Sequence, residues 1–181
     1  MKLFGLAGWS GAGKTTLVIR LLPALAARGL SVSTMKHAHH SFDIDSEGKD
    51  SWRHRQAGAH EVMVASAHRW ALMHEHRGAP DPTAAEPTAA ELARRMSPVD
   101  LLLVEGFKRE PHEKLEVYRA ANGKPLLHPA DPLIVAVASD VALPGIALPV
   151  LPLDDVEAIA DFIVARCGLA AAPRPAGGTA G

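Results

Sequence analysis

The sequence predicts an α/β fold of the P-loop NTPase type: a mostly parallel sheet flanked by helices in three layers, with a small antiparallel hairpin. Two observations predict this fold. A short apolar strand at the amino terminus passes through a glycine-rich loop into an amphipathic helix, and a second strand follows over residues 30–35. Farther along, residues 100–104 read Asp-Leu-Leu-Leu-Val, a run typical of a parallel strand that is covered on both faces.

The chain begins with a strand, a helix and a second strand. Residues 2–7 form the apolar first strand. From Lys14 onward apolar residues recur at intervals of three and four, which predicts a helix closing at residues 28–29. Pro23 removes one backbone donor inside this helix and is expected to bend it without ending it. Crossovers of this kind are right-handed and join parallel strands.

The rest of the chain supplies the remaining layers. The further elements that we expect are a loop over 36–49, a helix over 50–57, two hairpin strands over 61–66 and 69–74, a loop over 78–87, a helix over 88–96, strands over 115–118 and 133–138, and a helix over 154–167. We expect one domain over residues 1–169. Residues 170–181 are an Ala/Pro/Gly tail, expected to be disordered because it can bury little apolar surface.

Composition narrows the class of protein. The 181 residues have a formal net charge of -1, which offers no basic field for nucleic acid or an anionic membrane. No apolar run approaches the roughly 20 residues that cross a bilayer, and the amino terminus lacks the features of a signal peptide. The single cysteine, Cys167, excludes an internal disulfide and fits a reducing compartment. We therefore expect a cytoplasmic protein with no nucleic-acid or membrane partner.

Residues 8–15 match the P-loop spacing G-x-x-x-x-G-K-[ST] and read Gly-Trp-Ser-Gly-Ala-Gly-Lys-Thr. They lie between a strand and a helix, which is the context that the motif requires. Glycines let backbone N–H groups wrap around phosphate oxygens, and the helix start adds partial positive charge. Lys14 supplies a charge for the β- and γ-phosphates, and Thr15 a hydroxyl for Mg²⁺. The expected nucleotide-binding residues are Gly8, Ser10, Gly11, Ala12, Gly13, Lys14, Thr15 and Thr16.

An acid at the end of a neighbouring strand is expected to complete the metal site. Glu105 follows the apolar run at 101–104 directly and is the best candidate for Mg²⁺ or its water shell. A strand-terminal acid with no such role is the alternative. Asp100 precedes the same run and should lie at the opposite end of the strand.

A histidine-rich loop follows the second strand, at the sheet edge where parallel α/β folds bind ligands. Within it, Asp43 and Asp45 can reach the Mg²⁺ shell or orient an attacking water. The three histidines are His37, His39 and His40. Imidazoles at this spacing suit zinc or copper, and they can equally bond phosphate or a pterin. A solvated polar loop is the third interpretation.

Together these motifs resemble the MobB family of molybdopterin-guanine dinucleotide biosynthesis adaptor proteins. The resemblance runs from residue 2 to residue 169. It is carried by residues 8–15, 34–40 (Thr-Met-Lys-His-Ala-His-His), 45, 48–51 (Gly-Lys-Asp-Ser), 55, 57–59 (Ala-Gly-Ala) and 104–108 (Val-Glu-Gly-Phe-Lys).

The resemblance implies a dimeric GTP-binding protein of the P-loop GTPase class with weak GTPase activity. Such proteins assist the guanylyltransferase that attaches GMP to molybdopterin. By motif, residues 11–16 would hold the phosphates and magnesium, with Asp45 and Glu105 beside the metal. The residues that would border the nucleotide or pterin groove are His37, His39, His40, Lys49, Asp50 and Arg55.

The residues that would recognise guanine are less evident from the sequence. The Asn/Thr-Lys-x-Asp sequence that often reads guanine is absent. Ser139 and Asp140 follow the strand at 133–138, in the corresponding position, and the carboxylate of Asp140 can bond the guanine edge. An ordinary turn at a strand end is the alternative, so the base identity rests on the family resemblance.

Three functions are compatible with these residues. In the first, an adaptor binds GTP and Mg²⁺ and hydrolyses GTP slowly, with Lys14 and Mg²⁺ neutralising the leaving charge and Asp45 orienting water. The sequence identifies no arginine that stabilises the transferred charge. In the second, a small-molecule kinase passes the phosphate to an acceptor held by the histidine loop. In the third, the three histidines make a metal-handling chaperone GTPase.

Overall fold

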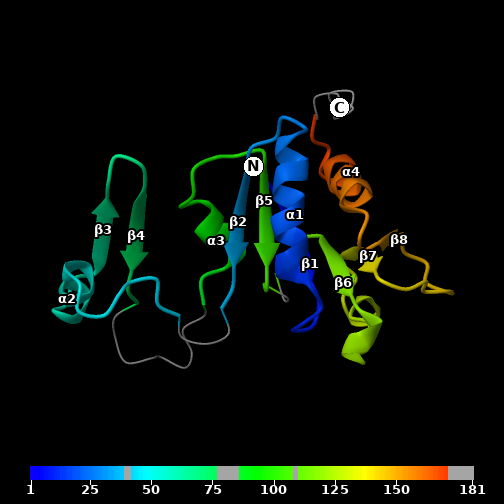
Figure 1. Cartoon of the computed structure of the whole chain (residues 1–181), viewed down its shortest axis with the longest axis horizontal. Coiled ribbons are helices and arrows are strands. Elements are labelled where there is room, and N and C mark those ends of the chain that lie inside the picture. The colour runs from blue at the N-terminus through cyan, green and yellow to red at the C-terminus, as the bar shows by residue number, and fades with distance from the viewer. Residues whose placement is uncertain (39–41, 77–85, 108–109, 171–181) are drawn as a thin grey trace, which may run out of the picture. The chain divides into compact units, whose positions relative to one another are not determined.

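The computed structural model describes residues 1–38, 42–76, 86–107 and 110–170 (Figure 1). The elements in chain order are β1 (Lys2–Ala7), α1 (Lys14–Ala26), β2 (Val32–Lys36), α2 (Asp50–Gln56), β3 (Glu61–Ala65), β4 (Trp70–His74), α3 (Ala89–Ala93), β5 (Leu101–Glu105), β6 (Lys114–Tyr118), the 3₁₀ turns η1 (Ala120–Asn122) and η2 (His128–Ala130), β7 (Ile134–Ser139), β8 (Val150–Pro152) and α4 (Val156–Cys167). Contacts divide the chain into two compact units. The first comprises residues 1–37 and those from 87 onward, and the second is Ala38–Glu86.

The first unit is built on a six-stranded sheet with the order β2-β5-β1-β6-β7-β8. Its neighbouring strands all pair in parallel. Leu6 is in register with Glu105, and Ala7 with Glu116. The carboxyl ends of β1, β5 and β6 therefore lie at one edge of the sheet, as the predicted fold requires.

Helices cover both faces of this sheet. Along β5 the alternate residues Leu101 and Leu103 belong to a cluster that includes Leu21 of α1 and Ile159 of α4. Leu102 and Val104 belong to a second cluster, with Ala89 and Ala93 of α3. Successive side chains of a strand point to opposite faces, so α1 and α4 lie on one face and α3 on the other. The predicted three-layer fold is confirmed.

The second unit contains α2 and the predicted antiparallel hairpin. Val62 is in register with Met73, and both are buried. The turn has no glycine. Instead, Ser66 closes it: its N–H donates to the carbonyl of Arg69 at 2.8 Å, and its hydroxyl accepts the N–H groups of His68 and Arg69 at 3.3 Å.

Several helix and strand ends differ from the predicted ones by one or two residues. Helix α1 continues past Pro23 as expected, but it ends at Ala26 and closes through Gly29, whose φ is 77°. Helix α2 has Lys49 at its N-cap, which makes no side-chain capping bond. The hydroxyl of Ser51, in the first turn, donates to Asp45 at 2.8 Å. Strand β8 was not predicted. The expected loop at 78–87 and tail at 170–181 fall almost wholly outside the described residues.

One partly buried histidine makes the stability of the first unit depend on pH. His112 packs against β1 where Gly5 leaves room, since a Cβ added to Gly5 would lie 2.6 Å from its Nε2. Burial, followed by the nearby charge of Lys114, lowers the pKa of His112 from 6.5 to about 4. Between these two values the unfolded chain binds a proton that the folded chain does not, so the free energy of unfolding must fall as the pH falls.

We expect His112→Gln to flatten this dependence. In the wild type, the free energy of unfolding should fall between pH 6.5 and pH 4 by at most about 1.4 kcal/mol per pH unit. The slope is expected to be smaller than that limit because the ring is only partly buried. Urea unfolding at pH 7.5, 6 and 5 measures it, with exposed His68→Gln as the control. Equal slopes for the wild type and H112Q would contradict this assignment.

Candidate nucleotide-binding site

The loop between β1 and α1 has the backbone conformation that a phosphate-binding loop needs. Gly8, Gly11 and Gly13 have φ angles of 145°, 80° and 97°. At Gly8 a side chain has no room either, because an added Cβ would lie 2.5 Å from the carbonyl oxygen of Val117 in β6. Gly13 is the N-cap of α1 and contributes no side-chain cap. The first-turn N–H groups of α1 therefore face the loop with their partial positive charge.

Lys14 gives this loop a positive charge and also closes it through hydrogen bonds. Its Nζ donates to the carbonyl oxygens of Gly8 at 2.9 Å and Trp9 at 3.0 Å. The ammonium thereby bridges the two ends of the loop, and its contact with the β- and γ-phosphates stays a prediction.

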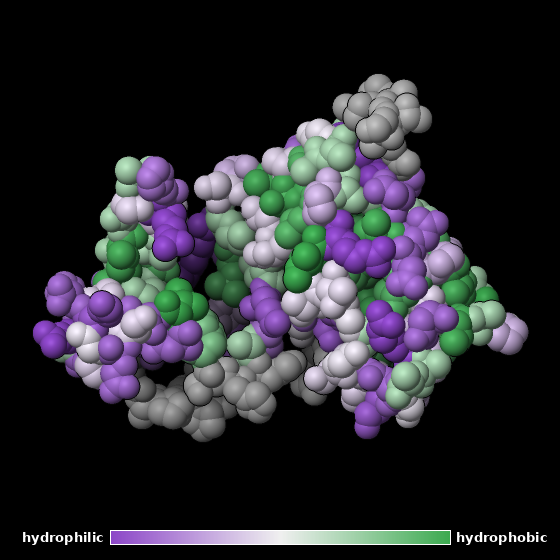
Figure 2. Space-filling view, in the orientation of Figure 1, coloured by the Kyte–Doolittle hydropathy of each residue, from purple (hydrophilic) through white to green (hydrophobic). Residues whose placement is uncertain are grey.

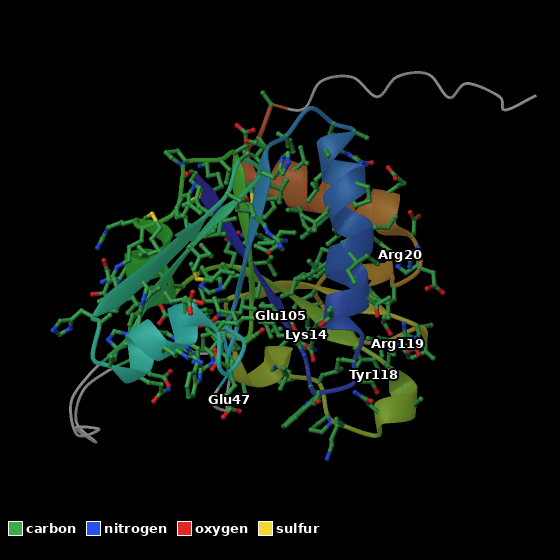
Figure 3. The ribbon with its side chains drawn as sticks, turned by 60° about the vertical axis from the view of Figure 1, so that its left-hand side comes forward. Lys14, Arg20, Glu47, Glu105, Tyr118 and Arg119 are labelled. Carbon is green, nitrogen blue, oxygen red and sulfur yellow. The ribbon has the colours of Figure 1, made fainter. Side chains whose placement is uncertain are left out.

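Thr15 and Glu105 come together from elements far apart in the sequence. The hydroxyl of Thr15 donates to both carboxylate oxygens of Glu105 at 3.4 Å. The Nζ of Lys36, at the end of β2, lies 3.8 Å from the same carboxylate. Figure 3 labels Glu105, at the end of β5, and Lys14, at the start of α1. A hydroxyl and one carboxylate are ligands that suit a largely hydrated Mg²⁺.

The described residues contain no group of three or more His, Cys, Asp or Glu side chains placed to hold a metal ion together. His37 extends β2, its N–H donating to the carbonyl of Glu105 at 2.8 Å. Its ring packs on Phe107, with centroids 5.0 Å apart. His39 and His40 lie outside the described residues, so the structure does not test the three-histidine metal site.

The segment after β6 packs against the loop, which the sequence did not reveal. The Nδ2 of Asn122 donates to the carbonyl of Ser10 at 3.1 Å, and the indole N–H of Trp9 donates to the carbonyl of Pro125 at 2.8 Å. The guanidinium of Arg119 lies against Gly13, where an added Cβ would be 3.1 Å from its Nε. The missing signal was the pairing of β6 with β1, which is not visible in local patterns.

Asp140 stands at the end of β7, next to the only unpredicted strand among the described residues, β8. One carboxylate oxygen accepts the N–H of Ala120 at 2.9 Å, and the other lies 3.9 Å from Nη1 of Arg119. A pocket of about 540 Å³ opens beside it, lined by residues 139–144 and 150–152. Figure 2 shows hydrophobic residues gathered at this β7–β8 edge. Most of the lining is apolar, which suits a flat heterocycle.

Comparison with known proteins identifies the family. Residues 3–140 match the family model described as MobB, molybdopterin guanine dinucleotide synthesis protein B. The chain belongs to this family.

Its relatives agree with that assignment over nearly their whole length. The molybdopterin-guanine dinucleotide biosynthesis adapter protein of Escherichia coli K12 is 46% identical over 165 residues, which cover 90% of this chain and 91% of that protein. The protein of the same name from Haemophilus influenzae is 43% identical over 161 residues, covering 89% and 86%. A crystal structure of molybdopterin-guanine biosynthesis protein B superposes with a TM-score of 0.68 at 28% identity, covering 91% of this chain and 99% of the other.

Three of the groove residues that the MobB resemblance implied, Lys49, Asp50 and Arg55, belong to the second unit. Arg55 is at the centre, donating to Asp43 at 2.8 Å, to Asp45 at 3.3 Å and to Glu75 at 2.7 Å. The N–H of Asp45 and then the guanidinium of Arg55 lower the pKa of Asp43, and the bonds that Arg55 donates to Glu75 and Asp43 raise the pKa of Arg55. Lys49 and Asp50 stand at the start of α2.

This network has a consequence for the role of Asp45. Its side chain is 8% exposed and already accepts bonds from Arg55 and Ser51. Catalysis or metal binding by Asp45 therefore stays a prediction, and it would require the carboxylate to exchange one of these bonds.

Among the helices that the structure describes, none has the length and apolar character of a membrane span.

Glu105→Gln tests the metal pair. The amide keeps the shape of the side chain but loses the charge next to Thr15, so the Mg²⁺ concentration for half-maximal binding of a fluorescent guanine nucleotide should rise about tenfold. Glu113→Gln is the matched control, since Glu113 precedes β6 at the opposite edge of the sheet and pairs with Arg166. An unchanged Mg²⁺ requirement in E105Q would remove Glu105 from the metal site.

Proposed function

We propose that the chain is a GTP-binding adaptor in the synthesis of molybdopterin guanine dinucleotide. It binds GTP and Mg²⁺ at the P-loop, hydrolyses GTP slowly and assists the guanylyltransferase that attaches GMP to molybdopterin. Family membership supports the pathway. One observation in the structure supports the nucleotide: Lys14 bridges a glycine-rich loop at the start of α1, beside the Thr15–Glu105 pair.

The order of strands supports one orientation of the nucleotide. Glu105 of β5, Lys14 after β1, and Asp140 after β7 stand in that order along the carboxyl edge, because the sheet runs β5-β1-β6-β7. The metal and the γ-phosphate would lie at the β5 side, the other phosphates over the loop, and the base in the pocket beside Asp140. Ligands of parallel α/β sheets bind at this edge.

The chemistry assigned to the chain is positioning and electrostatic stabilisation. Lys14, the first-turn N–H groups of α1 and the bound Mg²⁺ would neutralise charge on the phosphates during transfer to water. In this proposal Asp45 orients the water. A slow basal rate suits an adaptor whose main task is to present a ligand to a partner enzyme.

The remaining partners belong to the same proposal. Molybdopterin, the guanylyltransferase and a second copy of the chain are its binding partners, as the family resemblance implies. The histidine loop and the Arg55 network would border the pterin. A cytoplasmic location accompanies it, in keeping with the free thiol of Cys167.

Lys14→Ala is the primary test of the proposal. GTP with Mg²⁺ should raise the melting temperature of the wild type, and the alanine variant should lose that rise while keeping its own fold. The assay should compare GTP, GDP, ATP and XTP, with and without molybdopterin. Unchanged stabilisation in K14A would refute the nucleotide site.

The product separates the adaptor from a kinase. An adaptor yields only slow GDP and inorganic phosphate, whereas a kinase would pass phosphate to an acceptor in stoichiometric amount. Phosphate release measured against GDP formation decides between them, and a shortfall of free phosphate would favour the kinase.

Asp140→Asn tests the base pocket. A carboxylate accepts both the N1–H and the amino group of guanine, whereas xanthine carries a carbonyl in place of that amino group. The asparagine oxygen can still accept the N–H of Ala120, so the loop should keep its shape. GTP affinity should fall about thirtyfold and XTP affinity should rise. Equal losses for both nucleotides would indicate that Asp140 only supports the turn.

A further inference from the structure

The loop after β6 faces the P-loop at the point where the connections between strands leave in opposite directions. From β1 the chain crosses to β2 on one side, and from β6 it proceeds to β7 on the other, although β1 and β6 are neighbours. Segments that leave adjacent strands in opposite directions open a crevice between them, where α/β sheets bind ligands. The two walls of this switch point are residues 8–13 and residues 119–125, which contact each other through Asn122 and Trp9.

Arg119 is the cationic side chain that this second wall brings to the P-loop. Its Nε and Nη2 would lie 3.1 and 3.5 Å from a Cβ built on Gly13, so the guanidinium packs closely against the backbone of the loop. The side chain is 38% exposed and open to a ligand. Figure 3 shows Arg119 and Tyr118 beyond Lys14, on the opposite side from Glu105.

The same guanidinium also reaches toward the base end of the site. Its Nη1 lies 3.9 Å from Oδ2 of Asp140, whose other oxygen holds the N–H of Ala120. At 3.9 Å this contact is an ion pair without a direct hydrogen bond, so donors of the guanidinium are available to a ligand. Arg119 thus stands between the phosphate loop and the residue proposed to read the base.

We propose that Arg119 binds the α- and β-phosphates of the nucleotide and is a second phosphate-binding cation beside Lys14. The proposal rests on the nucleotide orientation given above, in which the γ-phosphate and Mg²⁺ lie at the β5 side. A planar guanidinium with parallel donors matches non-bridging phosphate oxygens better than an ammonium does. Because both GTP and GDP carry these phosphates, Arg119 supports binding of both and contributes equally to each.

Arg119→Gln tests the proposal by direct nucleotide binding. Titration calorimetry at fixed Mg²⁺ should show about a twentyfold weaker affinity for GTP and for GDP, the loss expected of one charge-assisted contact. The slope of log Kd against log salt should become shallower by roughly one charge. Arg119→Lys keeps the charge without the parallel donors, so its affinities should lie between those of the wild type and R119Q. The preference for GTP over XTP should not change.

Arg20→Gln is the matched control. Arg20 is 41% exposed, close to the value for Arg119, and it binds the carbonyl of Asp154 away from the P-loop. Its removal should leave both affinities unchanged. Figure 3 shows it farther along α1 from Lys14.

Other outcomes would overturn the inference in distinguishable ways. If R119Q kept its GDP affinity but hydrolysed GTP more slowly, Arg119 would act on the γ-phosphate instead. If R119Q lost the preference for GTP over XTP with an unchanged salt slope, the role of Arg119 would be only to position Asp140. Unaltered affinities in R119Q, with K14A still defective, would reject Arg119 alone. Absence of nucleotide binding by the wild type would refute the proposed function itself.

Discussion

The close parallel pairing of β1 with β5 and β6 is the constraint on which the candidate site depends. β1 lies between these two strands, so the loop that follows it emerges between their carboxyl ends. On the β6 side the approach is so close that Gly8 cannot carry a side chain beside the carbonyl of Val117. On the β5 side the register of Leu6 with Glu105 brings a carboxylate to the start of α1. Both the metal pair and the second wall of the crevice follow from this pairing.

Within that frame the loop is held by its own charge. Lys14 binds carbonyl oxygens at the beginning of the loop and is itself the first residue of α1, so the ammonium links the two ends. The side chains of Asn122 and Trp9 also fix the loop, by bonding it to the segment after β6. A loop held by several bonds is already arranged for an anion, which lowers the entropy that binding would otherwise cost.

The sequence predicted those features that depend on short stretches of chain. Periodicity identified α1 and α4, and the apolar run at 101–104 identified the two-sided burial of β5. Thr15 and Glu105 are in contact, as expected of a P-loop with an acid at the end of a neighbouring strand. Whether that pair binds Mg²⁺ stays a prediction.

Other features could not be predicted because they depend on pairing between distant segments. β8 has three residues and ends in a proline, too few to show any alternation. Arg119 and Asn122 look like an ordinary polar turn until β6 is known to lie beside β1. Arg55 binds residues as many as 20 positions away in the sequence, and no local pattern shows that one guanidinium will bind three carboxylates.

A buried carboxylate explains how the segment after β6 can hold Arg119 in a defined position. Glu116 is 1% exposed and in register with Ala7, inside the sheet. A buried charge is costly unless it is fully hydrogen-bonded, and Glu116 accepts the N–H groups of Leu127 at 2.7 Å and His128 at 2.9 Å. The far end of the segment is thereby anchored to the same strand from which it leaves. The wall that carries Arg119 is therefore a closed loop fixed at both ends to β6, and its position relative to the P-loop is set by the core of the sheet.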